Sequence, residues 1–253
     1  MKSNEYIGFK QTEPDVQQNF SFLKEKNMRP VPSGIAYTYP PTAYKDGRKS
    51  VCEIPDDYVQ SALSESDYQD LSSEFGVEVA LVKAVMKVES NGSGFLLKEA
   101  APSRPKILFE GHWFYKLTPK PVSKIRPDLS YAKWDKSKYR GGSGEWERLL
   151  DAMEFDEIQA LKSASYGLGQ VMGFNYPAAG CTSIQQFIQE SFAGEYWQAR
   201  HMMNFIRTKG LQDELQQRDW REFAETYNGP GYAKNQYHIK LERAYQEALA
   251  GKI

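Results

Sequence analysis

Apolar residues recur three and four positions apart along most of the chain after residue 56, and this spacing predicts a mainly helical body. In the segment 78–89, Val82, Val85 and Met86 fall on one helix face, while Lys83 and Lys87 point away from it. The same reasoning predicts further helices over residues 64–75, 144–152, 156–163, 183–190, 194–208, 219–227 and 232–250.

Prolines interrupt this helical pattern in two regions. Six prolines lie before residue 56 and five more lie between residues 102 and 127. Because proline lacks the backbone donor and clashes with the preceding turn, neither region should contain long helices. We interpret residues 1–55 as an irregular proline-rich arm or a small appended element. Residues 56–253 then form the main domain, which is mainly α with an irregular or β-containing excursion over 92–140 (α+β class).

The overall charge and hydropathy exclude several classes of protein. The chain has 32 Lys and Arg against 33 Asp and Glu, a formal net charge of −1, whereas a dedicated nucleic-acid binder usually has a strong basic excess. No segment approaches the roughly 18 consecutive apolar residues that a membrane helix needs. The N-terminal sequence contains no apolar core of the secretory type, so we expect synthesis in the cytoplasm without a signal peptide.

The cysteines and histidines show no metal-binding pattern. Cys52 and Cys181 lie far apart, and they are either free thiols or a pair that forms in an oxidising compartment. His112, His201 and His238 also lack ligand spacing. We therefore expect no metal and no organic cofactor.

The excursion has a charge of its own. Residues 98–140 contain eleven basic and four acidic residues, a net charge of +7, together with seven aromatic residues. Such a segment suits an anionic polymer with apolar sugar faces, or a nucleic-acid strand. It is equally compatible with a solvated loop region whose aromatic side chains pack on the helices.

Glu89 is the strongest candidate for a chemical role. It lies on the apolar stripe of the helix predicted over 78–89, and the segment Ser90-Asn-Gly-Ser-Gly94 ends that helix directly afterwards. The negative end of the helix dipole and apolar neighbours both favour the protonated carboxyl, which is the form that a general acid requires. The alternative is a glutamate that turns to solvent in a frayed last turn.

Two later segments are less specific by themselves. Residues 165–173 contain three glycines, which suit a close approach of the backbone to another group or a helix crossing eased by small residues. Gln170 in this segment offers a donor and an acceptor to a polar ligand. Tyr227-Asn-Gly-Pro-Gly231 follows an apolar helix face and is an ordinary helix end when taken alone.

The three segments taken in order resemble the motifs of the goose-type lysozyme and lytic transglycosylase superfamily. These motifs are Glu89-Ser90, Gly167-Leu-Gly-Gln170 and Tyr227-Asn-Gly-Pro-Gly231. The stretch 104–115, Arg-Pro-Lys-Ile-Leu-Phe-Glu-Gly-His-Trp-Phe-Tyr, is similar more particularly to the N-acetylmuramidase family of phage endolysins and related bacterial toxins. The resemblance covers about residues 60–250. It implies a lysozyme-like fold of two lobes with a substrate groove, and cleavage of the β-1,4 bond between N-acetylmuramic acid and N-acetylglucosamine.

The resemblance also implies roles for individual residues and partners. Glu89 matches the catalytic acid, and Glu110 is the candidate for a second carboxylate. The expected substrate contacts are Ser90, His112, Tyr166, Gln170, Tyr227 and Asn228. The expected partner is the peptidoglycan glycan strand, cut by a monomer in the periplasm or cell wall after delivery by a phage holin or a secretion system. The secretion route would imply an immunity protein.

Two departures favour a hydrolase within this superfamily. Gly169 stands where transglycosylases usually have methionine, and Asn228 meets Gly229 without the usual intervening residue. The alternatives are a lytic transglycosylase, which forms 1,6-anhydromuramic products, and a peptidoglycan-binding protein without activity. The stereochemical course, inverting or retaining, stays open.

Overall fold

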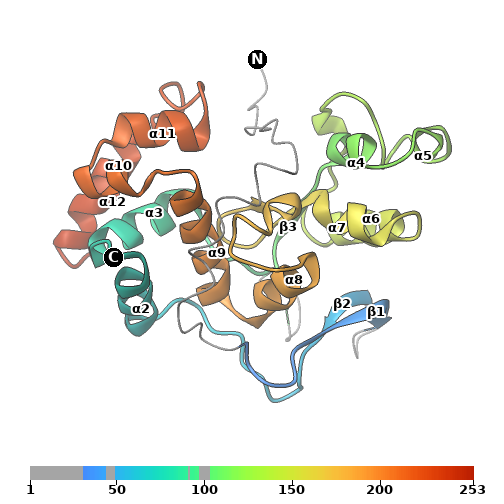
Figure 1. Cartoon of the computed structure of the whole chain (residues 1–253), viewed down its shortest axis with the longest axis horizontal. Helices are drawn as coiled ribbons and strands as arrows, with labels where there is room; N and C mark the ends of the chain where they lie inside the picture. The colour runs from blue at the N-terminus through green and yellow to red at the C-terminus, as the bar shows by residue number, and fades with distance from the viewer. Residues whose placement is uncertain (1–30, 44–48, 91, 97–102) are drawn as a thin grey trace.

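Helices dominate the computed structural model, which describes residues 31–43, 49–90, 92–96 and 103–253. The predicted mainly α class is confirmed (Figure 1). No helix in these ranges is long and apolar enough to cross a membrane. The helices are α2 (Glu65–Phe75), α3 (Val79–Glu89), α4 (Gly111–Leu117), α5 (Pro121–Ile125), α6 (Ser143–Met153), α7 (Glu157–Lys162), α8 (Ile184–Ala193), α9 (Glu195–Thr208), α10 (Gln212–Gln217), α11 (Trp220–Asn228) and α12 (Tyr237–Leu249).

The helices form two groups on either side of α8 and α9. Helices α2, α3, α10, α11 and α12 lie on one side, and α4 to α7 lie on the other (Figure 1). Within the first group α3 packs against α12 and α2, and α11 packs against α12 and α10. The buried face of α3 includes Val82, Val85 and Met86, as the apolar spacing predicts.

A three-stranded antiparallel sheet joins the excursion to the glycine-rich segment. Its strands are β3 (Ile107–Phe109), β4 (Ala164–Tyr166) and β5 (Val171–Met172), in the order β3-β4-β5. Ile107 pairs with Tyr166, and Ser165 pairs with Met172. In the described part of the proline-rich region 102–127 the helices are the short α4 and α5, as expected from the loss of backbone donors.

The described part of the N-terminal arm is a β-hairpin. Strands β1 (Ala36–Ala43) and β2 (Lys49–Glu53) pair antiparallel, with a shift of register between Tyr37 and Thr42. That interval contains two consecutive prolines, which cannot donate to the ladder. The hairpin contacts α8, and Val51 and Cys52 are buried in the main hydrophobic core. Residues 1–30 lie outside the described residues. Both cysteines of the chain are free and buried.

One predicted helix starts later in the structure. The last helix begins at Tyr237 and not at residue 232, because the preceding residues form turns in which Gln236 has a φ of 57°. The glycine-rich segment 165–173 contains the end of β4, a turn and β5. Gly167 and Gln170 have φ values of 69° and 46°, so the chain reverses between β4 and β5.

The glycines of residues 165–173 allow the backbone to approach neighbouring elements closely. This is one of the two explanations that the sequence left open, the other being a helix crossing. A Cβ at Gly169 would lie 2.6 Å from Sδ of Met202 on α9. A Cβ at Gly173 would lie 2.2 Å from the carbonyl oxygen of Leu161, at the end of α7. A backbone oxygen cannot rotate away as the side chain of Met202 can. A substitution at Gly173 should therefore be tolerated less well than one at Gly169.

We therefore expect Gly173→Ala to lower the free energy of unfolding by about 1–3 kcal/mol, the usual cost of overpacking. Gly231→Ala is the matched control, since its nearest neighbour would lie 4.0 Å away, and it should change stability by less than about 0.5 kcal/mol. Urea unfolding followed by circular dichroism measures both variants. Equal stability of the two variants would contradict the packing described here.

Candidate active site

Glu89 is the last residue of α3, and the chain turns sharply after it. The N–H of Ser90 donates to the carbonyl oxygen of Met86 at 3.0 Å and closes the helix. The chain beyond is held by Glu195, the first residue of α9. Its Oε1 accepts from the N–H of Gly94 at 2.8 Å and from Oγ of Ser93 at 2.9 Å. This anchor fixes where α3 ends, and with it the position of Glu89.

The Glu89 carboxyl is half-buried and has one described hydrogen-bond partner, Asn228 at the end of α11. Nδ2 of Asn228 donates to Oε1 and Oε2 of Glu89 at 3.2 and 3.1 Å. Burial raises the pKa of Glu89 to about 7, and this outweighs the lowering by the Asn228 hydrogen bond and by the charge of Lys240. With this pKa a large fraction of the carboxyl is protonated near neutral pH.

Glu89 opens onto a groove of about 600 Å³ beside the end of α3. The end of α3, the β4–β5 turn, α9, α11 and α12 all contribute to its walls. Among the described residues that line it, Glu89 is the one carboxylate, and four are lysines. The lining residues include Lys87, Glu89, Ser90, Lys106, Gly167, Gln170, Asn175, Phe205, Lys209, Thr226, Tyr227, Asn228, Asn235, Tyr237 and Lys240.

The structure thus brings together five of the expected site residues at this groove: Glu89, Ser90, Gln170, Tyr227 and Asn228. Gln170, however, uses its side-chain amide within the protein. Its Nε2 donates to the carbonyl oxygens of Gly167 (2.8 Å) and Lys106 (3.2 Å), and its Oε1 accepts from Oγ of Ser165 at 2.9 Å. Gln170 therefore ties the β4–β5 turn to the strand of the excursion and shapes the groove wall.

Glu110, His112 and Tyr166 lie outside the residues that line the groove. Glu110 is buried at the start of α4, where Oη of Tyr139 donates to its Oε2 at 2.6 Å and Nδ1 of His112 lies 3.1 Å from the same atom. Tyr166 is buried in β4 and donates its hydroxyl to the carbonyl oxygen of Leu161 at 3.0 Å. Glu110 and His112 are therefore held within the excursion, and Tyr166 binds the end of α7.

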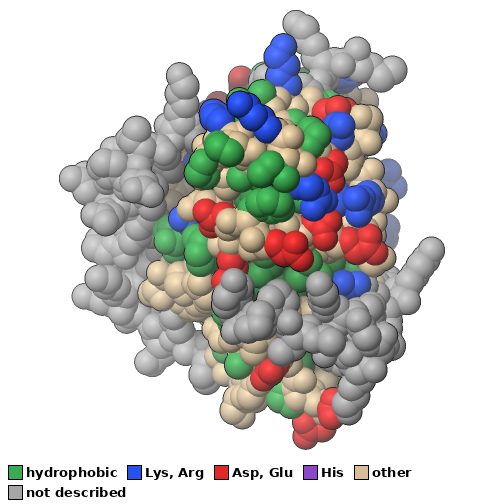
Figure 2. Space-filling model, turned by 90° about the vertical axis from the view of Figure 1, so that its right-hand side faces the viewer, with side chains coloured by type: hydrophobic (Ala, Val, Ile, Leu, Met, Phe, Trp, Pro, Cys, Tyr) green, Lys and Arg blue, Asp and Glu red, His purple; other side chains and the backbone are tan. Residues whose placement is uncertain are grey.

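Two arginines of the excursion are paired with neighbouring acids. Arg126 bonds Asp128 and Asp151 at 2.8 and 2.9 Å, and Arg140 lies 3.3 Å from Glu147 on α6. The face shown in Figure 2 accordingly carries basic and acidic side chains side by side. Of the basic residues of the excursion, Lys106 is the one that lines the groove among the described residues.

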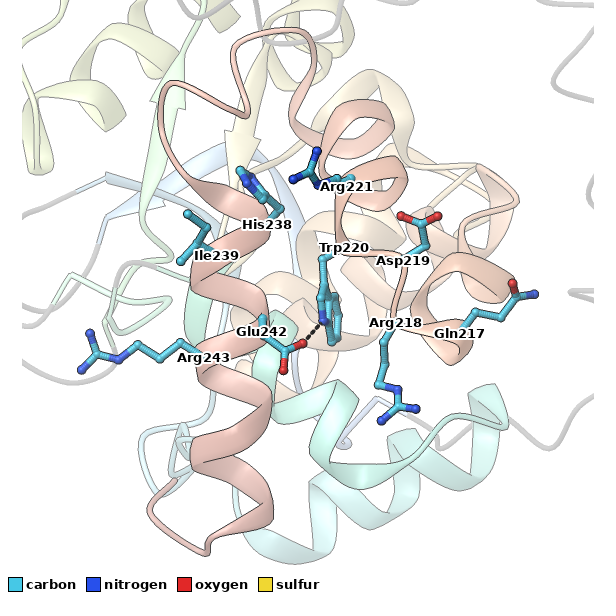
Figure 3. Close-up of a pocket in the computed structure, with 9 residues that line it drawn as sticks. All are labelled: Gln217, Arg218, Asp219, Trp220, Arg221, His238, Ile239, Glu242 and Arg243. Carbon is cyan, nitrogen blue, oxygen red and sulfur yellow. Dashed lines mark hydrogen bonds between the residues drawn. The ribbon is translucent and has the colours of Figure 1, made fainter.

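A second cavity, of about 750 Å³, lies between α12 and the start of α11 (Figure 3). Its two acids are already engaged. Asp219 caps α11 by accepting from the N–H of Glu222 at 3.1 Å, and Glu242 accepts from Nε1 of Trp220 and from Nε2 of Gln246. Both acids are thus bound to neighbouring groups of the protein, and we take the groove at Glu89 as the candidate active site.

Comparison with known proteins identifies the family of the chain. A model of the N-acetylmuramidase family matches residues 78–249, a range that contains Glu89 and nearly all of the groove. The chain belongs to the N-acetylmuramidase family. The crystal structure of the Burkholderia AP3 phage endolysin is similar to it, with 32% sequence identity, a TM-score of 0.68, and coverage of 76% of this chain and 72% of that chain. A search of curated proteins found no match.

As a muramidase, the protein is an enzyme that cleaves peptidoglycan. Several groove residues of this muramidase escaped the sequence reasoning, among them Asn175, Phe205, Lys209, Tyr237 and Lys240. They come from three separate parts of the chain: Asn175 after β5, Phe205 and Lys209 at the end of α9, and Tyr237 and Lys240 on α12. No spacing along the chain relates these three parts to one another. For Tyr237 and Lys240 the helix was predicted, but its packing against α3 was not.

The raised pKa of Glu89 makes the stability of the muramidase depend on pH. Between about pH 4.5 and 7 the folded state binds more protons than the unfolded state, so stability falls as pH rises through this range. Glu89→Gln cannot titrate there. The free energy of unfolding of Glu89→Gln relative to the wild type should therefore increase by at most about 3 kcal/mol as pH rises from about 4.5 to 7. Below and above this range the difference between the two proteins should be constant.

Urea unfolding at pH 4, 5.5 and 7.5 measures this dependence. Glu225→Gln, an exposed substitution on α11, is the matched control and should follow the wild-type curve. A difference between Glu89→Gln and wild type that does not change with pH would contradict the raised pKa.

Proposed function

We propose that the chain is a lysozyme-type hydrolase that cuts the β-1,4 bond between N-acetylmuramic acid and N-acetylglucosamine, with Glu89 as the general acid. The observation that carries the proposal is a half-buried carboxyl with a pKa of about 7 facing a groove. A glycosidic bond breaks only when its leaving oxygen is protonated, and an acid with a pKa near the working pH suits that step.

In the proposed reaction the Glu89 carboxyl gives its proton to the glycosidic oxygen as the bond to the anomeric carbon breaks. Water then adds to the positively charged sugar and releases a proton to the solvent. A carboxylate nucleophile would have to stand about 5–5.5 Å from the acid, and no Asp or Glu besides Glu89 lines the groove among the described residues. We therefore infer that polar side chains such as Thr226 and Asn235 hold the attacking water, which gives inversion.

The lysines of the groove support an anionic substrate. Lys87, Lys106, Lys209 and Lys240 approach the groove from four different elements or loops. Burial lowers the pKa of Lys209 to about 8, which leaves it mostly protonated at neutral pH. Peptidoglycan carries carboxylates on its peptide stems, whereas chitin is a neutral polymer, so the charge of the groove favours peptidoglycan strands.

The biological setting follows from the similarity to an endolysin. We propose that the protein is made in the cytoplasm and acts on the cell wall as a monomer during phage lysis, in line with the solved structure that it resembles. Delivery by a secretion system is the alternative, and a cognate immunity protein would then accompany it. Lysis on cytoplasmic expression, compared with expression behind a signal peptide, distinguishes these routes.

The single groove carboxylate also favours a second candidate, a lytic transglycosylase. In that reaction one glutamate serves as acid and then as base, and the C6 hydroxyl of the muramic acid attacks in place of water. The products differ by one water molecule. Mass spectrometry of muropeptides from purified peptidoglycan therefore decides between them: reducing muramic ends support the hydrolase, and 1,6-anhydromuramic ends overturn it.

Glu89→Gln keeps the shape of the side chain and removes the transferable proton. We expect it to lower the rate of release of soluble muropeptides by about 10²–10⁴-fold, the usual contribution of a general acid. Glu110→Gln is the matched control, because its carboxylate lies outside the groove lining. It should keep most of the activity. Wild-type turnover by Glu89→Gln would remove Glu89 from the mechanism, and a comparable loss in folded Glu110→Gln would make Glu110 the second carboxylate.

The rate should also depend on pH through Glu89. Since the protonated form is the active one, kcat/KM should fall as pH rises above about 7. Asn228→Ala removes a hydrogen bond that lowers the pKa of Glu89, so the alkaline limb of this variant should move to higher pH. A profile whose alkaline limb is unchanged in Asn228→Ala would show that another group controls it.

A further inference from the structure

Three buried side chains converge between α8 and α9, away from the groove. Cys181 lies in the loop before α8, Glu190 on α8 and His201 on α9, and each is at most 5% exposed. Nε2 of His201 lies 2.7 Å from Oε2 of Glu190. Sγ of Cys181 lies 3.5 Å from both of these atoms. One sulfur, one nitrogen and one oxygen therefore form a small triangle.

The triangle has nearly the dimensions of one face of a tetrahedral zinc site. Zinc binds nitrogen and oxygen at about 2.0–2.1 Å and sulfur at about 2.3 Å, which places ligand atoms roughly 3.3–3.5 Å apart. Both sulfur distances already agree with this. The nitrogen–oxygen distance is shorter because these two atoms share a hydrogen bond, and it needs to open by roughly 0.6 Å to admit the ion.

We propose that Cys181, Glu190 and His201 bind one zinc ion, with a water molecule as the fourth ligand. The donor set selects the metal: a thiolate and an imidazole suit zinc, whereas magnesium and calcium prefer sites built from oxygen alone. In the described part of the chain, this is the one group of three or more His, Cys, Asp or Glu side chains whose donor atoms lie within 4.8 Å of one another.

The surroundings hold these ligands in place. Nε2 of Gln186 donates to Oε1 of Glu190 at 2.8 Å, which leaves Oε2 facing the other two ligands. The ring of Phe187 stacks on the ring of His201, with centroids 4.5 Å apart and planes 22° apart. Such outer contacts orient the ligands of metal sites. Without a metal, the thiol of Cys181 donates to Oε2 of Glu190 at 3.5 Å, and His201 bonds the same oxygen. Zinc would replace these hydrogen bonds, and binding of the ion distinguishes the two arrangements.

Zinc at this position would stabilise the elements behind the groove without contacting the residues that line it. It would tie the loop before α8 to α8 and α9 (Figure 1). From α9, Oε1 of Gln198 accepts from the N–H of Leu168 at 2.9 Å and so holds the β4–β5 turn. None of the three ligands lines the groove. The expected effect is therefore on stability and not on the chemical step, and it does not depend on the proposed function.

The test adds zinc chloride to metal-free, reduced protein and measures bound zinc and the melting temperature. We expect one zinc ion per chain and a rise in Tm of about 5–10 °C when free zinc is about 100 times its Kd. Cys181→Ser retains a small hydrogen-bonding side chain and should lose both effects. Cys52→Ser is the matched control, since Cys52 is the other buried free thiol of the chain, and it should retain both.

Cobalt(II) reports on the sulfur ligand without relying on stability. Wild type and Cys52→Ser should show a near-ultraviolet sulfur-to-cobalt charge-transfer band with tetrahedral visible bands, and Cys181→Ser should lack the charge-transfer band. Well below one zinc per wild-type chain, or no charge-transfer band in wild type, would overturn the proposal. So would a band that survives in Cys181→Ser or disappears in Cys52→Ser. The wild-type and Cys52→Ser results decide the matter even where Cys181→Ser does not fold.

Discussion

The desolvation of the Glu89 carboxyl is the constraint on which the rest of the site depends. Helix α3 buries Val85 and Met86 in the core, and α12 packs against α3, so the last residue of α3 cannot turn fully to water. The described partner of the carboxyl, Asn228, is a neutral amide. It orients both oxygens but supplies no charge, and the pKa accordingly stays near 7. An arginine in its place would hold the carboxyl ionised and remove its use as an acid.

Two other buried carboxylates, those of Glu195 and Glu145, bind backbone N–H groups and so hold loops in place. Glu195 accepts from Gly94 and thereby sets the turn after α3. Glu145 accepts from the N–H groups of Phe109, Arg140 and Gly141, and it also bonds Arg148 at 2.7 Å. Glycine and proline prevent regular helices in these loops, and the carboxylates supply the missing hydrogen bonds. Glu89, by contrast, receives no backbone donor among the described residues.

Much of the fold could be predicted from the sequence because helical periodicity is local. The apolar stripe of α3 placed Glu89 at its buried end, and the prolines of 102–127 correctly excluded long helices there. The glycine-rich segment was harder to predict, since glycine suits a helix crossing and a tight turn equally well. Its strands form because β3 offers a partner from a distant part of the chain, and no local pattern reports that pairing. The start of α12 was missed for a related reason: the positive φ at Gln236 follows from packing and not from its residue type.

By itself the sequence determined where most helices run and which carboxyl stands on an apolar stripe, since both depend on neighbours within a few residues. Only the tertiary structure decided which polar groups meet. Asn228 reaches Glu89 across 139 residues, Glu110 is drawn away to Tyr139, and Cys181 arrives beside His201. Such meetings depend on how helices and strands pack in three dimensions. Packing directs side chains from separate elements to one point, and no spacing along the chain encodes that point.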